Sequence, residues 1–408
     1  MLCRHCKTPL VHKFLDLGFA PPSNAYLSEE DLNKPELTFP LKLYVCDSCW
    51  LVQTQDFANA DALFTKDYAY FSSTSTSWLA HAKQYCDAIT AQLGLNSQSH
   101  VVELASNDGY LLKNFVQAGI PCLGIEPTAS TATAARKLGI PTLEEFFGTS
   151  LAKTLKAQGK EADLILGNNV YAHVPDINDF TQGIQTLLKP EGVVTLEFPH
   201  LLELIKHTQF DTVYHEHYSY LSLCTVQKIF KNAGLRVWHV EQLTTHGGSL
   251  RVYGCHLNAA YQCSSTVGDL LLEELTFGLQ NLDIYKSFQF KADSVKNNAL
   301  SFLLEQKRLG KTVVGYGAAA KGNTLLNYAG IKSDLLPFIY DAAQAKQGKY
   351  MPGSHIPILK PSTFEVTVPE YLWILPWNIS NEIRNINQEL ATRGTKFFTV
   401  IPCMEIDP

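Results

Sequence analysis

The chain has 408 residues, of which 46% are hydrophobic, and a formal net charge of -6 at pH 7. This length exceeds what one hydrophobic core usually serves, so we expect two or three domains. The small negative charge, without a long run of Lys or Arg, argues against a nucleic-acid partner. No stretch approaches the ~20 uninterrupted apolar residues of a membrane helix, and the start lacks the apolar run of a signal peptide. We therefore expect a cytoplasmic protein without a membrane partner, as a monomer or a small homo-oligomer.

Four of the ten cysteines form two tight pairs near the N-terminus. Each Cys-x-x-Cys pair places two thiolates across a turn, and two such pairs supply the four soft ligands of a tetrahedral zinc site. Four protein ligands leave no position for water, so the metal is expected to be structural. The alternatives are two unrelated pairs or a redox motif. The predicted ligands are Cys3, Cys6, Cys46 and Cys49.

The next part of the chain alternates between helical and strand patterns. Such alternation predicts a parallel sheet with helices on both faces. The expected helices are 78–93, 111–118, 131–138 and 180–188, and the expected strands are 100–105, 122–125, 163–166 and 192–198.

We expect a domain boundary near residues 259–263, followed by a second unit with an α/β pattern. Two long helical patterns, 267–288 and 292–309, come first, and strands are expected at 311–316, 335–341 and 370–375. The predicted fold class is therefore α/β: an N-terminal zinc-binding domain, a central Rossmann-like domain and a C-terminal Rossmann-like domain. The expected boundaries are 1–72, 73–258 and 259–408.

Polar turns follow the first two strands of the central domain, where open parallel sheets bind their ligands. The first turn runs from Glu103 to Gly109, but Ala105 and Asn107 stand where a methyltransferase normally has glycines. The second strand ends at Glu126-Pro127, where a carboxylate could accept hydrogen bonds from ribose hydroxyls. The pattern favours a nucleoside cofactor, and an α/β domain that binds some other nucleotide is the alternative.

A third strand ends in a polar cluster that contains Asn168, Asn169 and His173. Further along, two His, one Glu and three Tyr crowd into residues 214–220. His supplies a base near neutral pH, Glu can orient or polarise it, and Tyr can donate to a developing oxyanion. A polar surface segment, or a second metal site through His215 and His217, would also fit.

The backbone of residues 214–217 provides a test of this interpretation. A regular strand would place His215 and His217 on one side and Glu216 on the other. A site that uses both Glu216 and His217 therefore predicts irregular backbone, with His215 left in a structural role.

The C-terminal unit opens with a strand that enters a Gly-rich turn, Gly315 to Asn323. A helix N-terminus with a nearby Lys holds phosphate well, which makes Lys321 a candidate. Asp341 closes the following strand in the manner of a ribose-binding acid. A dinucleotide fold is therefore the alternative at this position.

Together these segments resemble the sugar C-methyltransferases that act on nucleotide-linked keto-deoxyhexoses, over essentially the whole chain. In that family a zinc-binding domain precedes a methyltransferase domain and a C-terminal α/β domain. The motifs that carry the resemblance are the four cysteines, Glu103–Gly109, Asn168–Pro175, Tyr214–Tyr218, His246–Arg251 and Gly315–Asn323.

The resemblance implies that His217 is the base and that Tyr214, Glu216 and His173 surround the sugar. The cofactors it implies are S-adenosylmethionine and structural zinc. Residues assigned to S-adenosylmethionine are Glu103, Ala105, Asn107, Asp108, Gly109, Glu126, Pro127, Asn168 and Asn169. Residues assigned to the nucleotide-sugar are Tyr70, His246, Ser249, Arg251, Lys321, Asn323 and Asp341.

The expected reaction is methylation of C3, beside the C4 ketone of a dTDP-linked keto-deoxysugar, through an enolate. One rival is a nucleotide-sugar oxidoreductase that uses NAD(P) at the C-terminal Gly-rich turn. The other is a zinc-ribbon interaction module whose α/β parts only bind nucleotide.

Overall fold

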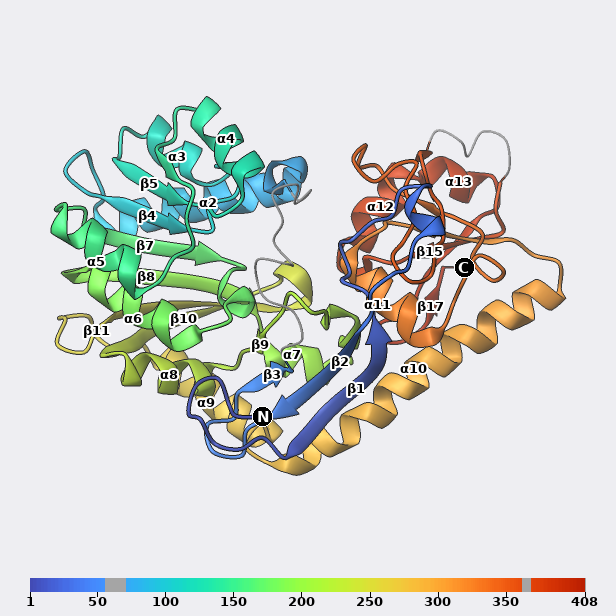
Figure 1. Cartoon of the computed structure of the whole chain (residues 1–408), viewed down its shortest axis with the longest axis horizontal. Helices are drawn as coiled ribbons and strands as arrows, with labels where there is room; N and C mark the ends of the chain where they lie inside the picture. The colour runs from blue at the N-terminus through green and yellow to red at the C-terminus, as the bar shows by residue number, and fades with distance from the viewer. Residues whose placement is uncertain (56–70, 362–367, 408) are drawn as a thin grey trace.

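The computed structural model describes residues 1–55, 71–361 and 368–407. Two α/β lobes stand side by side, and strands from the N-terminus run between them (Figure 1). The mixed α/β class and the three predicted parts are confirmed. Within the described ranges, no helix is both long and apolar enough to cross a bilayer.

The N-terminal part forms a four-stranded antiparallel sheet. Its strands are β1 (His12–Ala20), β2 (Phe39–Val45), β3 (Val52–Thr54) and β9 (Ser219–Tyr220). Between β1 and β2 lies the short 3-10 helix Asp31–Asn33. Strand β9 comes directly after the polar cluster at residues 214–218, so this cluster is attached to the zinc-binding part as well as to the central lobe.

The central lobe has a seven-stranded sheet in the order β10-β11-β8-β7-β4-β5-β6. Strands β4 to β8 pair in parallel as predicted, whereas β11 runs antiparallel to both of its neighbours, a hairpin arrangement that was not predicted. The strands are β4 (Val101–Leu104), β5 (Cys122–Ile125), β6 (Thr142–Leu143), β7 (Ala162–Asn168), β8 (Leu188–Pro199), β10 (Leu235–Leu243) and β11 (Ser249–His256).

The helix Thr76–Leu93 of this lobe has a recognisable cap at each end. The Ser75 side chain accepts the Trp78 amide at the start of α2, and left-handed Gly94 ends that helix. The helices are α2 (Thr76–Leu93), α3 (Leu112–Gln117), α4 (Ala129–Lys137), α5 (Thr149–Ala157), α6 (Ile177–Leu187), α7 (Leu201–Lys206) and α8 (Leu223–Asn232).

Two long helices connect the lobes, α9 (Ser265–Phe277) and α10 (Leu282–Arg308). The predicted break between them, after residue 288, was wrong. Helix α9 ends at Gly278, which has φ +99°, and Asn281 caps the start of α10 by accepting the Asp283 amide. Glycine adopts this left-handed conformation without a Cβ penalty, so the chain breaks there and not where the apolar spacing weakens.

The C-terminal lobe has a six-stranded sheet in the order β14-β13-β12-β15-β16-β17, parallel except for β17. Its strands are β12 (Val313–Tyr316), β13 (Ile339–Tyr340), β14 (Ile358–Leu359), β15 (Tyr371–Ile374), β16 (Lys396–Thr399) and β17 (Glu405–Ile406). Its helices are α11 (Ala320–Ala329), α12 (Ser380–Ile386) and α13 (Gln388–Thr392).

The N-terminal sheet shares a hydrophobic core with the C-terminal lobe. Phe14 of β1 packs against Tyr285 and Phe288 of α10, with ring centroids 5.3 and 4.9 Å away. Figure 1 shows α10 running beside β1 and under the C-terminal lobe. The zinc-binding part is therefore built into the lobe arrangement and is not an appended module.

Each α/β sheet has a point where the strand order reverses. In the central sheet, β5 pairs with one edge of β4 and the later strand β7 pairs with the other edge. In the C-terminal sheet, β13 and β15 flank β12 in the same way. Ligand crevices form beyond the carboxyl ends of strands at such points. The structure thus offers two crevices, one in each lobe.

Candidate active site

One cavity of about 440 Å³ joins the two crevices. Its walls come from the turns after β4, β5 and β7, from the 214–217 segment, and from the turns after β12 and β15. Lining residues with predicted roles are Ala105, Asn107, Glu126, Pro127, Asn168, Asn169, His173, Tyr214, Glu216, His217, His246 and Lys321.

The turn after β4 has the backbone of a glycine turn without the glycines. Ala105 and Asn107 have φ values of 54° and 51°. Asparagine tolerates this left-handed region, whereas alanine is disfavoured there by about 1 kcal/mol or more. The Asn107 amide donates to Glu126 at 2.9 Å, and its side-chain oxygen accepts the Ser72 amide at 3.0 Å. The turn therefore links the end of β5 to the 3-10 helix Ser72–Thr74, which precedes α2.

Both oxygens of Glu126 accept backbone amides, from Asn107 and from Thr128, each at 2.9 Å. A carboxylate oxygen has a second lone pair, so Glu126 can still accept ribose hydroxyls from the cavity side. The buried Glu103 lies behind this turn, where burial and the nearby charges of Glu126 and Asp108 raise its pKa well above the usual value.

Three predicted cofactor residues, Glu103, Asp108 and Gly109, are not among the lining residues. Asp108 accepts the Ser73 amide at 3.1 Å, and a Cβ at Gly109 would come within 2.3 Å of Ile140. Their contacts shape the turn from behind. A direct role in cofactor binding stays a prediction for them.

The side chain of Asn168, at the end of β7, is shielded from solvent inside the cavity wall. Neither its oxygen nor its nitrogen has a hydrogen-bond partner in the part of the chain that the structure describes. Its neighbour Asn169 has φ 55° and donates to His246 Nε2 at 3.0 Å. Buried polar atoms are normally satisfied, so Asn168 fits a site that a polar ligand such as a nucleoside cofactor completes.

The segment from Tyr214 to His217 is a tight turn in which the His217 amide donates to the Tyr214 carbonyl at 3.0 Å. The irregular backbone predicted for a site with both Glu216 and His217 is therefore present. Tyr214, Glu216 and His217 line the cavity. His215 points to the zinc-binding part, where its Nε2 donates to the Phe39 carbonyl at 3.3 Å.

His217 is held in one tautomer. Its Nδ1 lies 3.1 Å from the Thr212 carbonyl, which can only accept, so Nδ1 carries the proton and Nε2 keeps its lone pair. Burial, and then the neighbouring His173, lower the pKa of His217 well below its usual value. Burial also lowers the pKa of His173 to about 4. Both rings are neutral at pH 7, with centroids 4.5 Å apart, and Tyr214 lies 4.0 Å from His217.

Asn24, which lines the cavity, was not predicted as a site residue. Its side-chain nitrogen donates to both carboxylate oxygens of Glu216, at 2.9 and 3.0 Å. It comes from the zinc-binding part and lies 192 positions before Glu216. In the sequence it stands in a Pro-Pro-Ser-Asn turn that carries no chemical signal, so only the folded chain reveals it.

The C-terminal lobe contributes two lysines to the cavity wall. Lys321, at the start of α11, donates to Asn378 at 3.0 Å and lies 4.6 Å from the Trp377 ring centroid. Burial lowers its pKa to about 8, while Asp211 acts in the other direction. Lys346, which was not predicted, also lines the cavity and donates to the Ala318 carbonyl at 2.8 Å.

Four residues predicted to bind the nucleotide-sugar lie away from the lining. Ser249 donates to the Thr245 carbonyl, Arg251 pairs with Glu197 at 2.7 Å, Asn323 accepts from Asn327, and Asp341 accepts the amides of Ala318 and Ala343. Each of the four side chains has at least one partner within the protein, although Asn323 Nδ2 has none in the described chain, and none of the four lines the cavity. Tyr70 lies outside the described residues.

The four predicted zinc ligands come together. Their sulfur atoms all lie within 4.8 Å of one another, with Cys3–Cys49 and Cys6–Cys46 both at 3.5 Å. A tetrahedral zinc with bonds of about 2.3 Å needs sulfurs roughly 3.8 Å apart, so the cluster fits the metal. The two pairs have matching turns, because the residue after each, Lys7 or Trp50, has positive φ.

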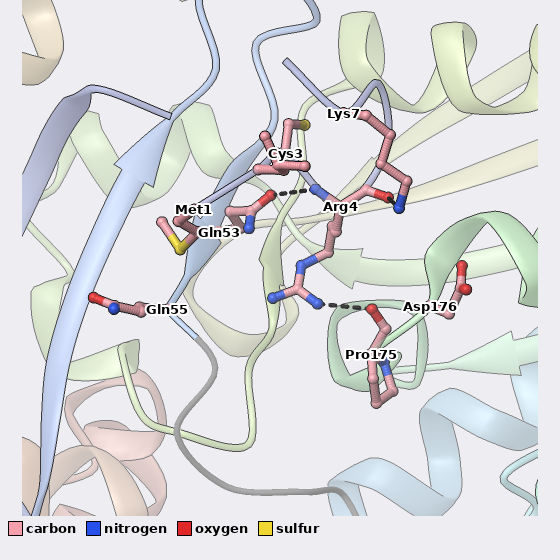
Figure 2. Close-up of a pocket in the computed structure, with 9 residues that line it drawn as sticks. Met1, Cys3, Arg4, Lys7, Gln53, Gln55, Pro175 and Asp176 are labelled. Atoms are coloured by element: carbon pink, nitrogen blue, oxygen red, sulfur yellow. Dashed lines mark hydrogen bonds between the residues drawn. The ribbon is translucent and has the colours of Figure 1, made fainter. Parts of the chain in front are cut away.

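The first pair is anchored to the central lobe through Arg4 (Figure 2). The Arg4 amide donates to Gln53 at 2.8 Å, and its Nη1 donates to the Pro175 carbonyl at 2.7 Å. Pro175 lies two residues after His173. The zinc site therefore supports the loop that carries one wall of the cavity, while no metal ligand reaches the cavity itself.

Comparison with known proteins agrees with this architecture. A family model described as a C-methyltransferase C-terminal domain matches residues 244–402, a zinc binding domain model matches residues 3–64, and a methyltransferase domain model matches residues 78–240. The C-methyltransferase NovU of Streptomyces niveus is 34% identical over 400 residues, which cover 98% of this chain and 95% of NovU. The chain belongs to the C-methyltransferase family. It uses S-adenosylmethionine and has a structural zinc site.

Solved structures match parts of this C-methyltransferase. A 1,6-didemethyltoxoflavin-N1-methyltransferase of Burkholderia thailandensis, at 14% identity and TM-score 0.37, covers 50% of this chain and 95% of its own. The magnesium protoporphyrin IX methyltransferase of Synechocystis PCC 6803 with bound S-adenosylhomocysteine, at 14% identity and TM-score 0.35, covers 44% and 84%.

Proposed function

We propose that this C-methyltransferase methylates C3, beside the C4 ketone of a nucleotide-linked keto-deoxysugar, with dTDP as the nucleotide and His217 as the base. The observation that carries the proposal is the state of His217. It is a buried, neutral imidazole with its Nε2 lone pair available, in the cavity that joins the crevices of the two α/β lobes. The proposed setting is the cytoplasm, as a monomer or small homo-oligomer, with domains 1–72, 73–258 and 259–408.

The chemistry of the cavity walls supports a division of the ligands. Ala105, Glu126 and Asn168 offer a turn, a carboxylate and an unsatisfied amide to a nucleoside cofactor at the β4 end. Lys321 and the N-terminus of α11, which has no side-chain cap, offer positive charge to a diphosphate at the other end. The sugar would then lie between them, beside residues 214–217.

When bound, S-adenosylmethionine supplies an electrophilic methyl group. His217 Nε2 takes the proton from C3, and the C–H electron pair moves into the C3–C4–O system as an enolate. A proton beside a ketone is too weak an acid for imidazole alone, so the enolate oxygen needs donors. A well-aimed donor contributes about 3 kcal/mol in comparable oxyanion sites, and the Tyr214 hydroxyl is the candidate. The neutral His173 ring has one N–H, which faces the Glu216 backbone, so His173 would act beside the sugar without donating to the enolate oxygen.

The lowered pKa of His217 sets the pH range of this base. Because the ring stays neutral well below its usual pKa, it keeps the lone pair as the pH falls through 6.5. The accompanying loss of basicity is the reason that enolate stabilisation must be strong here.

The test is the substitution His217→Ala, assayed with dTDP-linked 4-keto-deoxysugars for methylation and for solvent deuterium exchange at C3. We expect both to fall by at least about 100-fold, since a positioned general base contributes roughly 10²–10⁴. His207→Ala is the matched control, because the His207 side chain is partly exposed and pairs with Glu203 at 3.0 Å, away from the residues that line the cavity. Exchange that survives in His217→Ala would exclude His217 as the base.

A further inference from the structure

We infer that Asn24 is a positioning residue for the reaction, supplied by the zinc-binding part of the chain. This inference rests on the proposed function, because it assigns Asn24 the task of holding Glu216 against the sugar. The zinc-binding part then contributes directly to the catalytic site and does more than support it.

The contact between Asn24 and Glu216 is specific. One side-chain nitrogen donates to both oxygens of the carboxylate, at 2.9 and 3.0 Å, and both residues line the cavity. A donor between the two oxygens fixes the rotation of the carboxylate plane, which otherwise turns easily. Hydrogen bonds to a charged group are also stronger than those between neutral groups. Glu216 is thus held in one orientation before the substrate arrives.

The segment around Asn24 is itself fastened to the C-terminal lobe. The Tyr26 hydroxyl donates to the Ala318 carbonyl at 2.6 Å, and Leu27 exchanges backbone hydrogen bonds of 3.0 and 2.9 Å with Tyr350. Ala318 belongs to the Gly-rich turn that precedes Lys321. Figure 1 shows the loop between β1 and β2 lying against this lobe.

A second connection runs from this segment to the base. Ser23 lies 3.5 Å from the hydroxyl of Thr324, and that hydroxyl donates to the Val213 carbonyl at 2.8 Å. Val213 directly precedes the 214–217 turn. The segment around Asn24 therefore contacts both the Gly-rich turn before Lys321 and the residue that precedes the 214–217 turn. The Asn24 amide is the group of this segment that contacts Glu216.

The experiment compares three variants of the full-length zinc-loaded protein with a dTDP-linked 4-keto-deoxysugar. Asn24→Ala removes the donor, and Asn24→Asp keeps the shape but replaces the donor with a second carboxylate. Asn33→Ala is the matched control, because Asn33 is an exposed asparagine of the same segment. Zinc content and thermal unfolding are measured for each variant to confirm that it is folded.

We expect Asn24→Ala to lower kcat by about 10- to 100-fold, which corresponds to one hydrogen bond to a charged group. S-adenosylhomocysteine affinity should change less than twofold, because Asn24 acts at Glu216 and not at the β4 turn. Asn24→Asp should lower kcat at least as much as Asn24→Ala does, since the new carboxylate would face that of Glu216 and the two would repel. Asn33→Ala should match the wild type.

A double-mutant comparison separates positioning from folding. If Asn24 acts through Glu216, adding Asn24→Ala to Glu216→Gln should lower kcat by a much smaller factor than it does in the wild type. Full activity of Asn24→Ala, or of Asn24→Asp, in a folded protein would overturn the role of Asn24 and leave the proposed function unaffected. If the wild type neither methylates nor exchanges the sugar, the proposed function fails, and this inference falls with it.

Discussion

The substitution Arg251→Met tests whether this arginine serves the fold or the substrate. Sequence resemblance assigns Arg251 to the nucleotide-sugar, but the structure pairs its guanidinium with Glu197 at 2.7 Å and with Glu241 at 3.1 Å. Glu197 is fully buried on β8. Methionine keeps much of the apolar stem of arginine while removing the charge. The change therefore removes the ion pairs together with the contact of the guanidinium over the Tyr85 ring, 4.4 Å from the ring centroid.

The expected loss of stability follows from the burial of the pair. Removing one partner of a buried ion pair costs about 3–5 kcal/mol, because it leaves an uncompensated charge. His81 still lies 2.9 Å from Glu197, which places the expected value in the lower part of that range. Replacing both partners, in Arg251→Met with Glu197→Gln, should recover most of the loss.

The pH dependence of the loss has a definite sign. Burial alone would raise the pKa of Glu197, but the hydrogen bond from His81 and the charge of Arg251 outweigh it and lower the pKa. In the wild type this pair therefore stabilises the fold above the pKa of an unfolded Glu, about 4.3, and the contribution disappears as the pH falls through the lowered value. Without Arg251, burial dominates and the pKa of Glu197 rises. Protonation then relieves the buried charge, so the deficit of the variant should shrink between pH 7 and pH 5.

Urea unfolding of the wild type, both single variants and the double variant, at pH 7 and pH 5, measures these quantities. The KM for the nucleotide-sugar is measured alongside. Unchanged stability of Arg251→Met with a KM raised tenfold or more would refute the reasoning and restore Arg251 to the substrate.

Two further predictions concern the cofactors. Asn168→Ala should weaken S-adenosylhomocysteine binding about 10-fold by calorimetry without lowering the melting temperature of the unliganded protein, because the described structure gives its amide no partner to lose; a loss of stability with unchanged affinity would contradict this. Cys46→Ser should reduce the bound zinc measured by mass spectrometry and lower the urea midpoint, since the binding free energy of a structural zinc is folding free energy. The control is Cys263→Ala, which removes an exposed thiol outside the cluster, and an equal zinc content in both variants would exclude the four-cysteine site.

Features that depend on neighbouring residues were predictable. The zinc ligands could be predicted because each Cys-x-x-Cys turn is formed locally. The strand Cys122–Ile125 has the predicted bounds because a short apolar run bounded by turn residues is typical of a buried strand. The irregular turn at 214–217 also followed from a local argument, since alternation in a strand could not place Glu216 and His217 on one side.

The helix break at Gly278 shows the limit of local patterns. Apolar spacing continues across it, and only the left-handed glycine and the Asn281 cap show where one helix ends. The antiparallel placement of β11 was likewise missed, because a strand pattern does not say which neighbour it will pair with.

By itself, the sequence determined the α/β class, the zinc ligands and the polar turns that end the strands, because these depend on spacing within a few residues. Tertiary structure alone decided that Asn24 reaches Glu216 and that Arg251 is engaged by Glu197. Such contacts join distant segments through the packing of whole lobes. The type of a polar residue determines which hydrogen bonds it can make, but the fold determines whether its partner is another side chain or a ligand in the cavity.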